Sequence, residues 1–157
     1  MKKSVYIALE NIRSLYNIGS IMRTMSFYKL ENLILIGYSG KDKDRKNINP
    51  KIKKTSLGSQ KDIKVYLIDT SKDLVKYAKE KGLRIVCVEQ NTKSNRFEKH
   101  NFFDNTIYVL GNELAGISKT LIKNCNEILE IKRHGNHYSL NVSIVAGILI
   151  HNLVNCD

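Results

Sequence analysis

Short apolar runs, rich in β-branched residues, recur along the whole chain. Each run is nearly continuous, which is typical of strands that are covered on both faces of a parallel sheet. The pattern predicts six strands, at Val5–Leu9, Leu33–Gly37, Val65–Asp69, Arg84–Glu89, Ile107–Leu110 and Ile128–Ile131.

Helical periodicity lies between these runs. In Asn17–Tyr28 the apolar residues recur at steps of three and four, and Asn17 or a neighbour can cap the helix. Ser71 is expected to cap a second helix that continues to Lys81 and stops at Gly82. Because strands and helices alternate, the chain is expected to have an α/β fold with a mostly parallel sheet flanked by helices.

The last segment, Ser139–Val154, is apolar nearly all the way round. A helix without a polar face must be covered on every side. A chain of 157 residues has little spare protein to cover it, so a homodimer is expected, with a wholly intramolecular central helix as the alternative.

Two polar stretches, Gly40–Lys54 and Asn91–Asn105, are expected to be loops. The start of the chain lacks the features of a signal peptide, and no apolar run reaches the length of a membrane span, so a cytoplasmic protein without membrane contact is expected. Cys87, Cys125 and Cys156 show no paired spacing and are interpreted as reduced thiols.

Positive charge is in marked excess. Lysine and arginine total 26 against 15 acidic residues, a net charge of +11. Such an excess attracts polyanions, nucleic acid first and anionic membrane second. The alternative is that the charge only maintains solubility in a lysine-rich proteome.

Several nucleotide and metal motifs are absent from the sequence. The segment Gly111–Ser118 has the glycine spacing of a P-loop without its lysine, and no GxGxxG follows the first strand. There is no HExxH motif and no clustered Cys/His set, so no metal is expected.

Three polar segments can carry chemistry. The first runs from Asn17 to Arg23, the second is Gly111-Asn112-Glu113 after a strand, and the third is Ser139-Leu140-Asn141 before the last helix. Ligands in parallel sheets bind outside the carboxyl ends of strands, where the second and third segments are expected. Taken singly, each is also compatible with an ordinary helix cap or strand–helix connection.

Together, and in this order, the three segments resemble the motifs of the SpoU/TrmH-like branch of the SPOUT methyltransferases. The resemblance covers nearly the whole chain and implies a single SPOUT methyltransferase domain over residues 1–157, without a separate RNA-binding extension. It implies a deep trefoil knot in the C-terminal part, which is rare among proteins. It further implies a homodimer that transfers a methyl group from S-adenosylmethionine to a ribose 2′-hydroxyl of tRNA or rRNA, with tRNA favoured.

The resemblance also assigns residues. It implies that Glu89, Gly111, Ile131 and Leu140 bind the cofactor. It implies catalytic roles for Arg23, Asn17, Glu113, Ser139 and Asn141. A guanidinium scarcely deprotonates, so we expect Arg23 to orient the nucleotide and stabilise alkoxide character rather than act as a base. Glu113 is expected to hold either Arg23 or the loop in place.

Substrate capture is expected to use the surface of the catalytic domain. The candidates for phosphate contact are Arg13, Lys41, Lys43, Arg45, Lys51, Lys53, Lys54, Lys132 and Arg133. Tyr16 and Tyr138 can stack on a base, although packing in the core is the commoner use of tyrosine.

The chain departs from the family pattern at Leu114, where many relatives have glycine, and at Lys132-Arg133, where Pro-Met is usual. None of these departures removes a residue assigned to chemistry, but they leave the substrate open. The alternatives are a catalytically silent knotted RNA-binding module and a base-directed SPOUT methyltransferase. The sequence does not indicate which nucleotide is modified or whether a partner protein is needed.

Overall fold

One parallel sheet forms the centre of the molecule. The computed structural model describes residues 4–155. Seven strands pair in the order β3-β2-β1-β6-β4-β7-β5, and every pair is parallel. Their bounds are β1 Val5–Glu10, β2 Asn32–Ile36, β3 Lys64–Ile68, β4 Arg84–Val88, β5 Asn95–Arg96, β6 Thr106–Leu110 and β7 Glu127–Glu130. The six predicted strands are confirmed within one residue at each end, and β5 is an addition.

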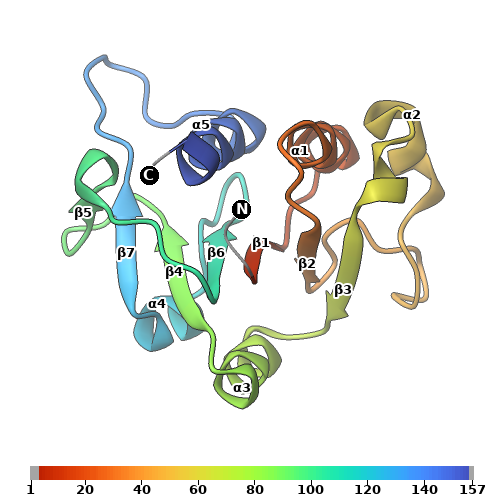
Figure 1. Ribbon diagram of the computed structural model, residues 1–157, viewed down its shortest axis with the longest axis horizontal. Helices are drawn as coiled ribbons and strands as arrows, with labels where there is room; N and C mark the ends of the chain where they lie inside the picture. The colour runs from red at the N-terminus through yellow and green to blue at the C-terminus, as the bar shows by residue number, and fades with distance from the viewer. Residues whose placement is uncertain (1–3, 156–157) are drawn as a thin grey trace.

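Helices cover both faces of the sheet. Figure 1 shows α1 and α5 on one face and α3 and α4 on the other. The helices are α1 Leu15–Phe27, α2 Lys53–Ser56, α3 Ser71–Lys81, α4 Lys119–Asn124 and α5 Val142–Asn155. Three single 3₁₀ turns are η1 Pro50–Ile52, η2 Ser59–Asp62 and η3 Phe97–Lys99.

The strand side chains alternate between two cores, one on each face of the sheet. Along β1, Ile7 and Leu9 join the core under α1 and α5, while Ala8 joins the core under α3 and α4. All three side chains are fully buried. The near-continuous apolar runs follow from this arrangement, because strands covered on both faces have no solvent-facing positions.

Two helices are capped one to three residues earlier than the sequence suggested. Ser14 caps α1, and its hydroxyl accepts a hydrogen bond from the backbone nitrogen of Asn17 at 3.2 Å. Thr70, not Ser71, caps α3, while Gly82 ends that helix in the left-handed conformation as predicted. A neighbouring hydroxyl offers the same chemistry, so the sequence does not distinguish between adjacent caps.

The last helix begins at Val142, three residues after the start of the predicted apolar segment at Ser139. Asn141 caps this helix, because its Oδ1 accepts the backbone N–H of Ser143 at 2.8 Å. Burial is one-sided: Leu149 is fully buried, whereas the side chain of Ile144 is 54% exposed. The intramolecular core therefore covers only part of this apolar helix.

The two predicted loops contain short regular elements. The segment from Gly40 includes an isolated bridge between Lys41 and Ile48, and it then enters η1 and α2 at Pro50. Proline suits the first position of a helical turn because its missing N–H would be unpaired there. The segment Asn91–Asn105 contains β5 and η3.

Cys87 is buried, Cys125 is half-buried, and both are free thiols, while Cys156 lies outside the described residues. Within residues 4–155 there is no helix long and apolar enough to cross a membrane.

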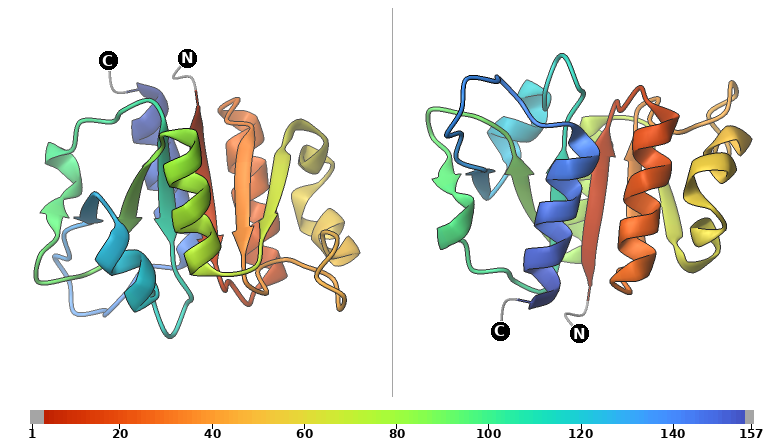
Figure 2. Two further views of the ribbon diagram at one scale, coloured as in Figure 1. Left: turned by 90° about the horizontal axis from the view of Figure 1, so that it is seen from below. Right: turned by 90° about the horizontal axis from the view of Figure 1, so that it is seen from above.

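Because all strands run the same way, their carboxyl ends share one edge. In Figure 2 the loops that follow β1, β2, β6 and β7 lie along this edge. The three polar segments singled out in the sequence meet there.

Candidate active site

A cavity of about 650 Å³ opens at the carboxyl edge of the sheet. Glu89 follows β4, Gly111 follows β6, Ile131 follows β7, and Leu140 precedes α5; all four line this cavity. The four residues predicted to bind a cofactor, which are far apart in the sequence, are thus brought together.

One wall of the cavity is apolar. It is formed by the ends of three strands and by the first turns of α5, through the side chains of Val88, Leu110, Ile131, Leu140, Val142 and Val145. The rest of the lining is polar and includes Lys132, Arg133, Ser139 and Asn141.

Gly111 permits a tight turn in the cavity floor. A Cβ on this residue would lie 2.5 Å from the backbone nitrogen of Ile117 and closer still to the carbonyl carbon of Gly116. Asn112 closes the turn: its backbone exchanges two hydrogen bonds with Gly116, and its Oδ1 accepts the N–H groups of Leu114 and Ala115. Only glycine at position 111 allows the backbone to approach this closely.

Glu89 supports the same turn from the neighbouring strand. Its Oε2 accepts the backbone N–H of Ile117 at 3.0 Å and lies close to the α-carbon of Gly116. Glu89 therefore shapes the cavity as well as lining it. Leu114, one of the departures from the family pattern, is 82% exposed on the rim of the turn.

Glu113 joins this turn to the start of α1. Its carboxylate accepts the backbone N–H groups of Arg13 at 3.1 Å and Ser14 at 3.3 Å, and the side-chain amide of Asn17 at 3.3 Å. Partial burial raises the pKa of Glu113, but these hydrogen bonds outweigh it and hold the pKa below its ordinary value. The carboxylate is therefore ionised at neutral pH.

Asn17 connects Glu113 to the third motif. Asn141 donates from its Nδ2 to Asn17 Oδ1 at 3.2 Å, so Asn17, Glu113 and Asn141 form one hydrogen-bonded cluster, of which Glu113 and Asn141 line the cavity. Ser139 lines the cavity nearby, with its backbone carbonyl hydrogen-bonded to His137 Nδ1 at 2.9 Å.

Arg23 lies apart from this cluster. It is exposed on the outer face of α1, in a stripe with Tyr16 and Phe27, whose side chains are 73% and 81% exposed. Among residues 4–155 no hydrogen bond or ion pair joins Arg23 to Glu113. Of the two roles expected of Glu113, holding the loop is the one that the contacts support.

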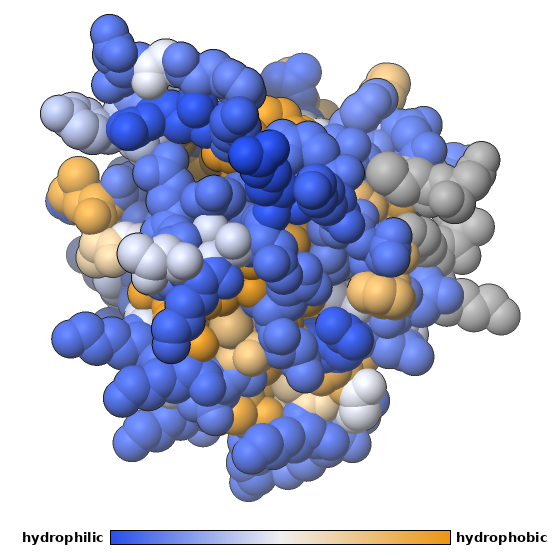
Figure 3. All heavy atoms as spheres, turned by 90° about the vertical axis from the view of Figure 1, so that its left-hand side faces the viewer, coloured by the Kyte–Doolittle hydropathy of each residue, from blue (hydrophilic) through white to orange (hydrophobic). Residues whose placement is uncertain are grey.

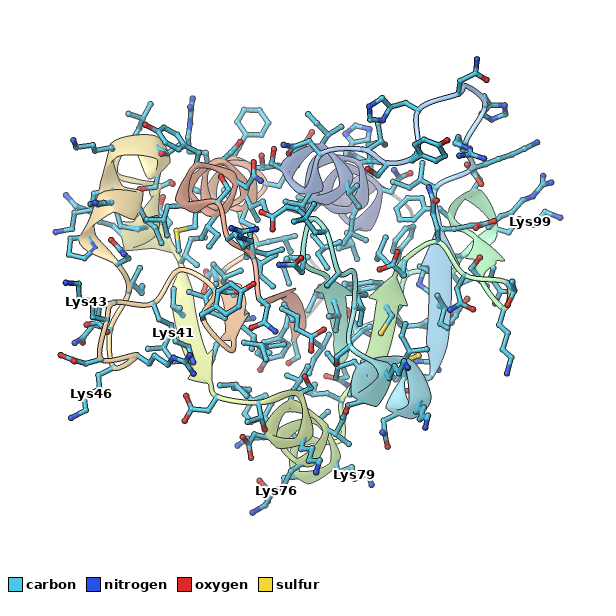
Figure 4. The ribbon with its side chains drawn as sticks, turned by 180° about the vertical axis from the view of Figure 1, so that it is seen from behind. Lys41, Lys43, Lys46, Lys76, Lys79 and Lys99 are labelled. Atoms are coloured by element: carbon cyan, nitrogen blue, oxygen red, sulfur yellow. The ribbon has the colours of Figure 1, made fainter. Side chains whose placement is uncertain are left out.

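The predicted RNA-binding residues fall into separate groups. Lys132 and Arg133 line the cavity, and Arg13 is exposed beside Glu113. The others follow β2 in the chain and lie near the edge of the sheet that β3 forms, whereas the cavity lies at β6, β4 and β7. Figure 4 shows this region around Lys43 and Lys46. The exposed residues there are Lys43, Arg45, Lys51, Lys53 and Lys54.

The prediction that Lys41 contacts phosphate is wrong. Its side chain is 1% exposed, and its ammonium group donates to the carbonyl oxygen of Ile68 at 2.7 Å and to Asp69 at 3.2 Å. Lys41 therefore stabilises the loop after β2 against the end of β3, and it does not present its charge to a ligand.

Asn112 and Glu10 make supporting contacts that were not predicted from the sequence. The side-chain amide of Asn112 donates to the carbonyl oxygen of Asn11 at 2.7 Å and to the Tyr38 hydroxyl at 2.9 Å. The buried carboxylate of Glu10 accepts the hydroxyl of Ser71 and the backbone N–H of Ser118. Glu10 ends an apolar strand and Asn112 lies in the Gly111-Asn112-Glu113 segment, but neither position indicates its partner.

The part of the chain that the structure describes contains no set of metal ligands. No three His, Cys, Asp or Glu residues are grouped there in a way that would hold an ion.

The fold and the cavity define an α/β protein with a small-ligand site at the carboxyl edge of a parallel sheet. Residues 4–151 match the SpoU rRNA methylase family, and the chain belongs to this family.

Individual relatives agree with this assignment. The tRNA (guanosine(18)-2′-O)-methyltransferase of Aquifex aeolicus is 27% identical over 150 residues, which are 96% of this chain and 68% of that protein. The mitochondrial rRNA methyltransferase 1 of Dictyostelium discoideum is 25% identical, over 98% of this chain and 29% of that protein.

A crystal structure of an rRNA methyltransferase from Sinorhizobium meliloti, with AdoMet bound, superposes with a TM-score of 0.86 at 22% identity. The match covers 98% of this chain and 56% of that one. The chain therefore spans between 29% and 68% of the length of these relatives.

Proposed function

We propose that this chain transfers the methyl group of S-adenosylmethionine to a ribose 2′-hydroxyl of RNA, with tRNA ahead of rRNA as the substrate. One observation carries the proposal. Three strand ends and the loop before α5 place Glu89, Gly111, Ile131 and Leu140 around one cavity, whose mouth holds the hydrogen-bonded cluster of Asn17, Glu113 and Asn141.

The residues present fit such a cofactor. The volume of about 650 Å³ lies within the usual range for small-molecule sites. The apolar lining residues suit an adenine ring, and the tight turn that Gly111 permits brings the backbone polar groups of Gly111 and Gly116 to the cavity. When bound, the cofactor supplies a methyl group on a cationic sulfonium.

The chain's own residues must position a ribose hydroxyl in line with that methyl group and relieve it of its proton. Asn17 and Asn141 are hydrogen-bond positioners, because Asn141 lines the cavity and Asn17 is hydrogen-bonded to two lining residues, Glu113 and Asn141. Glu113 holds the start of α1 against the turn after Gly111, so that both motifs keep a fixed separation.

Arg23 is proposed to act across a dimer interface. It lies six residues after Asn17, which on a helix is about 9 Å along the axis and about 120° around it. It therefore points away from the cavity of its own protomer, and the partner subunit's Arg23 is the group that completes the site. A guanidinium at the hydroxyl stabilises developing alkoxide character rather than removing the proton.

The exposed apolar surface of α1 and α5 supports a homodimer. Tyr16 and Phe27 on α1 and Ile144 on α5 all lie on the same side of the sheet and are more than half exposed. Aromatic and aliphatic residues around an arginine are typical of the buried centre of protein interfaces.

The C-terminal segment is proposed to form the deep trefoil knot of the family. The chain leaves β7, which lies between β4 and β5, crosses the carboxyl edge, and returns on the other side of β4 to pack α5 against α1. We propose one domain over residues 1–157, acting in the cytoplasm, where its RNA substrates are found.

Methyl transfer tests the proposal. The chain is incubated with labelled S-adenosylmethionine and with bulk tRNA or rRNA from a strain that lacks this protein, and cofactor binding is measured separately by calorimetry. We expect label in RNA from the wild type and none from Arg23→Ala, although both bind the cofactor. Arg23→Lys keeps the charge without the planar fork and is expected to retain little activity.

Two results would contradict the proposal. Cofactor binding without label in either RNA pool would contradict RNA as the acceptor. Failure to bind the cofactor and to transfer label would contradict the enzyme and leave the silent RNA-binding module as the better account.

A further inference from the structure

A basic loop projects over the rim of the cavity. It runs from Lys132 to Ser139, between β7 and α5, and every residue in it is exposed. Figures 1 and 2 show it as the light-blue segment that stands out from the sheet between these two elements. It includes the Lys132-Arg133 departure from the family pattern, so the family's cofactor site does not account for its composition.

The loop carries aromatic and cationic groups and no carboxylate. Its charged and aromatic residues are Lys132, Arg133, His134, His137 and Tyr138. Four of these line the cavity, and Tyr138 stands between two lining residues, His137 and Ser139. Hydrophilic side chains cover most of this side of the molecule, with apolar atoms visible in the recesses between them (Figure 3).

Local contacts present the ring of Tyr138 to solvent. The Nδ1 of His137 bonds to the carbonyl oxygen of Ser139 at 2.9 Å, and because a carbonyl only accepts, Nδ1 carries the hydrogen. This bond spans Tyr138, which is 80% exposed. The guanidinium of Arg133 lies over the ring, 5.9 Å from its centre.

We propose that this loop is a binding subsite for a nucleotide of the RNA, in which Tyr138 stacks on the base and Arg133 pairs with a phosphate. The proposal rests on the proposed function and adds to it the surface that holds the substrate nucleotide. An aromatic ring beside cations, without competing acids, is the combination that binds unpaired nucleotides.

The position of the loop suits a substrate nucleotide. The hydrogen-bonded cluster of Asn17, Glu113 and Asn141 lies at the mouth of the same cavity. A ribose held at that cluster would have its base and its adjacent phosphate near the lining residue Arg133 and near Tyr138, which follows the lining residue His137. In this arrangement the loop binds the base and the phosphate, and the cluster of Asn17, Glu113 and Asn141 positions the ribose for methyl transfer.

Stacking on Tyr138 is tested by affinity for two ligands. The dissociation constants for fluorescently labelled bulk tRNA and for S-adenosylmethionine are measured for the wild type, Tyr138→Ala and Tyr138→Phe. We expect Tyr138→Ala to bind tRNA about tenfold more weakly, since one stacked base contributes about that much, and Tyr138→Phe to bind within about twofold of the wild type. Cofactor affinity is expected to stay unchanged.

The phosphate role of Arg133 is tested by salt dependence. Removing one phosphate contact lowers the slope of log affinity against log salt by about one. We expect this of Arg133→Ala and not of the matched variant Lys79→Ala, which removes an exposed charge from α3 on the opposite face of the sheet.

Three results would overturn the subsite: tRNA affinity of Tyr138→Ala equal to that of Tyr138→Phe, equal losses of tRNA and cofactor affinity, or an unchanged salt slope for Arg133→Ala. A wild-type chain that binds tRNA but transfers no methyl group contradicts the proposed function alone. The tRNA affinities and salt slopes of the variants still test the subsite in that case.

Discussion

At the scale of single residues, the carboxylate of Glu113 is held by three hydrogen bonds that are stronger with its ionised state. Burial opposes this, yet the pKa is lowered overall. A lowered pKa stabilises the fold above the unfolded value near 4.5, and this stability is lost as the pH falls through the lower folded value.

The Glu113→Gln variant is therefore expected to unfold more easily at pH 7, by less than about 1 kcal/mol because the group is largely exposed to solvent. At about pH 3 the two proteins should have nearly equal free energies of unfolding, because Glu113 is then largely protonated. Urea denaturation of both proteins at the two pH values measures it, and a difference that is independent of pH would contradict the assigned hydrogen bonds.

Gly111 and Gly135 both line the cavity but differ in the space around them. A Cβ at Gly111 would collide with the backbone of Gly116 and Ile117, whereas nothing lies within 4 Å of one at Gly135. Gly111→Ala is expected to cost about 1–3 kcal/mol of unfolding free energy, and Gly135→Ala close to none. Equal midpoints of denaturation for the two variants would show that the turn is not tightly packed.

At the scale of elements, the strands were predictable because burial on both faces leaves continuous apolar runs in the sequence. Strand β5 was not, because it has only two residues, both exposed, and no apolar run marks it. The strand order was also beyond the sequence, since β6 inserts between β1 and β4, and pairing depends on where each crossover returns.

The candidate site was predictable where a motif residue follows a strand, as Gly111 and Ile131 do. The supporting contacts were not, because their partners are distant in the chain. Asn112 binds Asn11 from 101 residues away, and Glu10 binds Ser118 across 108 residues. Lys41 was misplaced for the same reason, because its partner Asp69 is brought near only by the pairing of β2 with β3.

Asn141 has two separable roles at the start of α5. Its Oδ1 caps the helix, while its Nδ2 donates to Asn17. Asn141→Ala is expected to lose about 1 kcal/mol of stability together with methyl transfer. Asn141→Asp keeps a capping oxygen but has no amide donor, so it should retain stability and still lose transfer. Thermal unfolding and transfer rates, compared for the two variants, test this, and an active Asn141→Asp would refute the positioning role.

At the scale of the whole molecule, one side of the sheet carries an exposed apolar surface on α1 and α5. Ile144→Glu places a charge there and is expected to shift the chain from dimer to monomer in sedimentation velocity, with methyl transfer lost. Leu57→Glu, a matched change at a residue 70% exposed beside α2, should leave the dimer intact. A monomeric wild type that transfers methyl groups would contradict the shared site.

The position of the methyl group in the product distinguishes ribose methylation from methylation of a base. RNA labelled by the wild-type chain is digested to nucleosides, and the labelled nucleoside is identified by chromatography and mass spectrometry. We expect a 2′-O-methylnucleoside that is absent when Arg23→Ala replaces the wild type. A label carried on a base would contradict it and indicate a base-directed enzyme built on the same sheet and cavity.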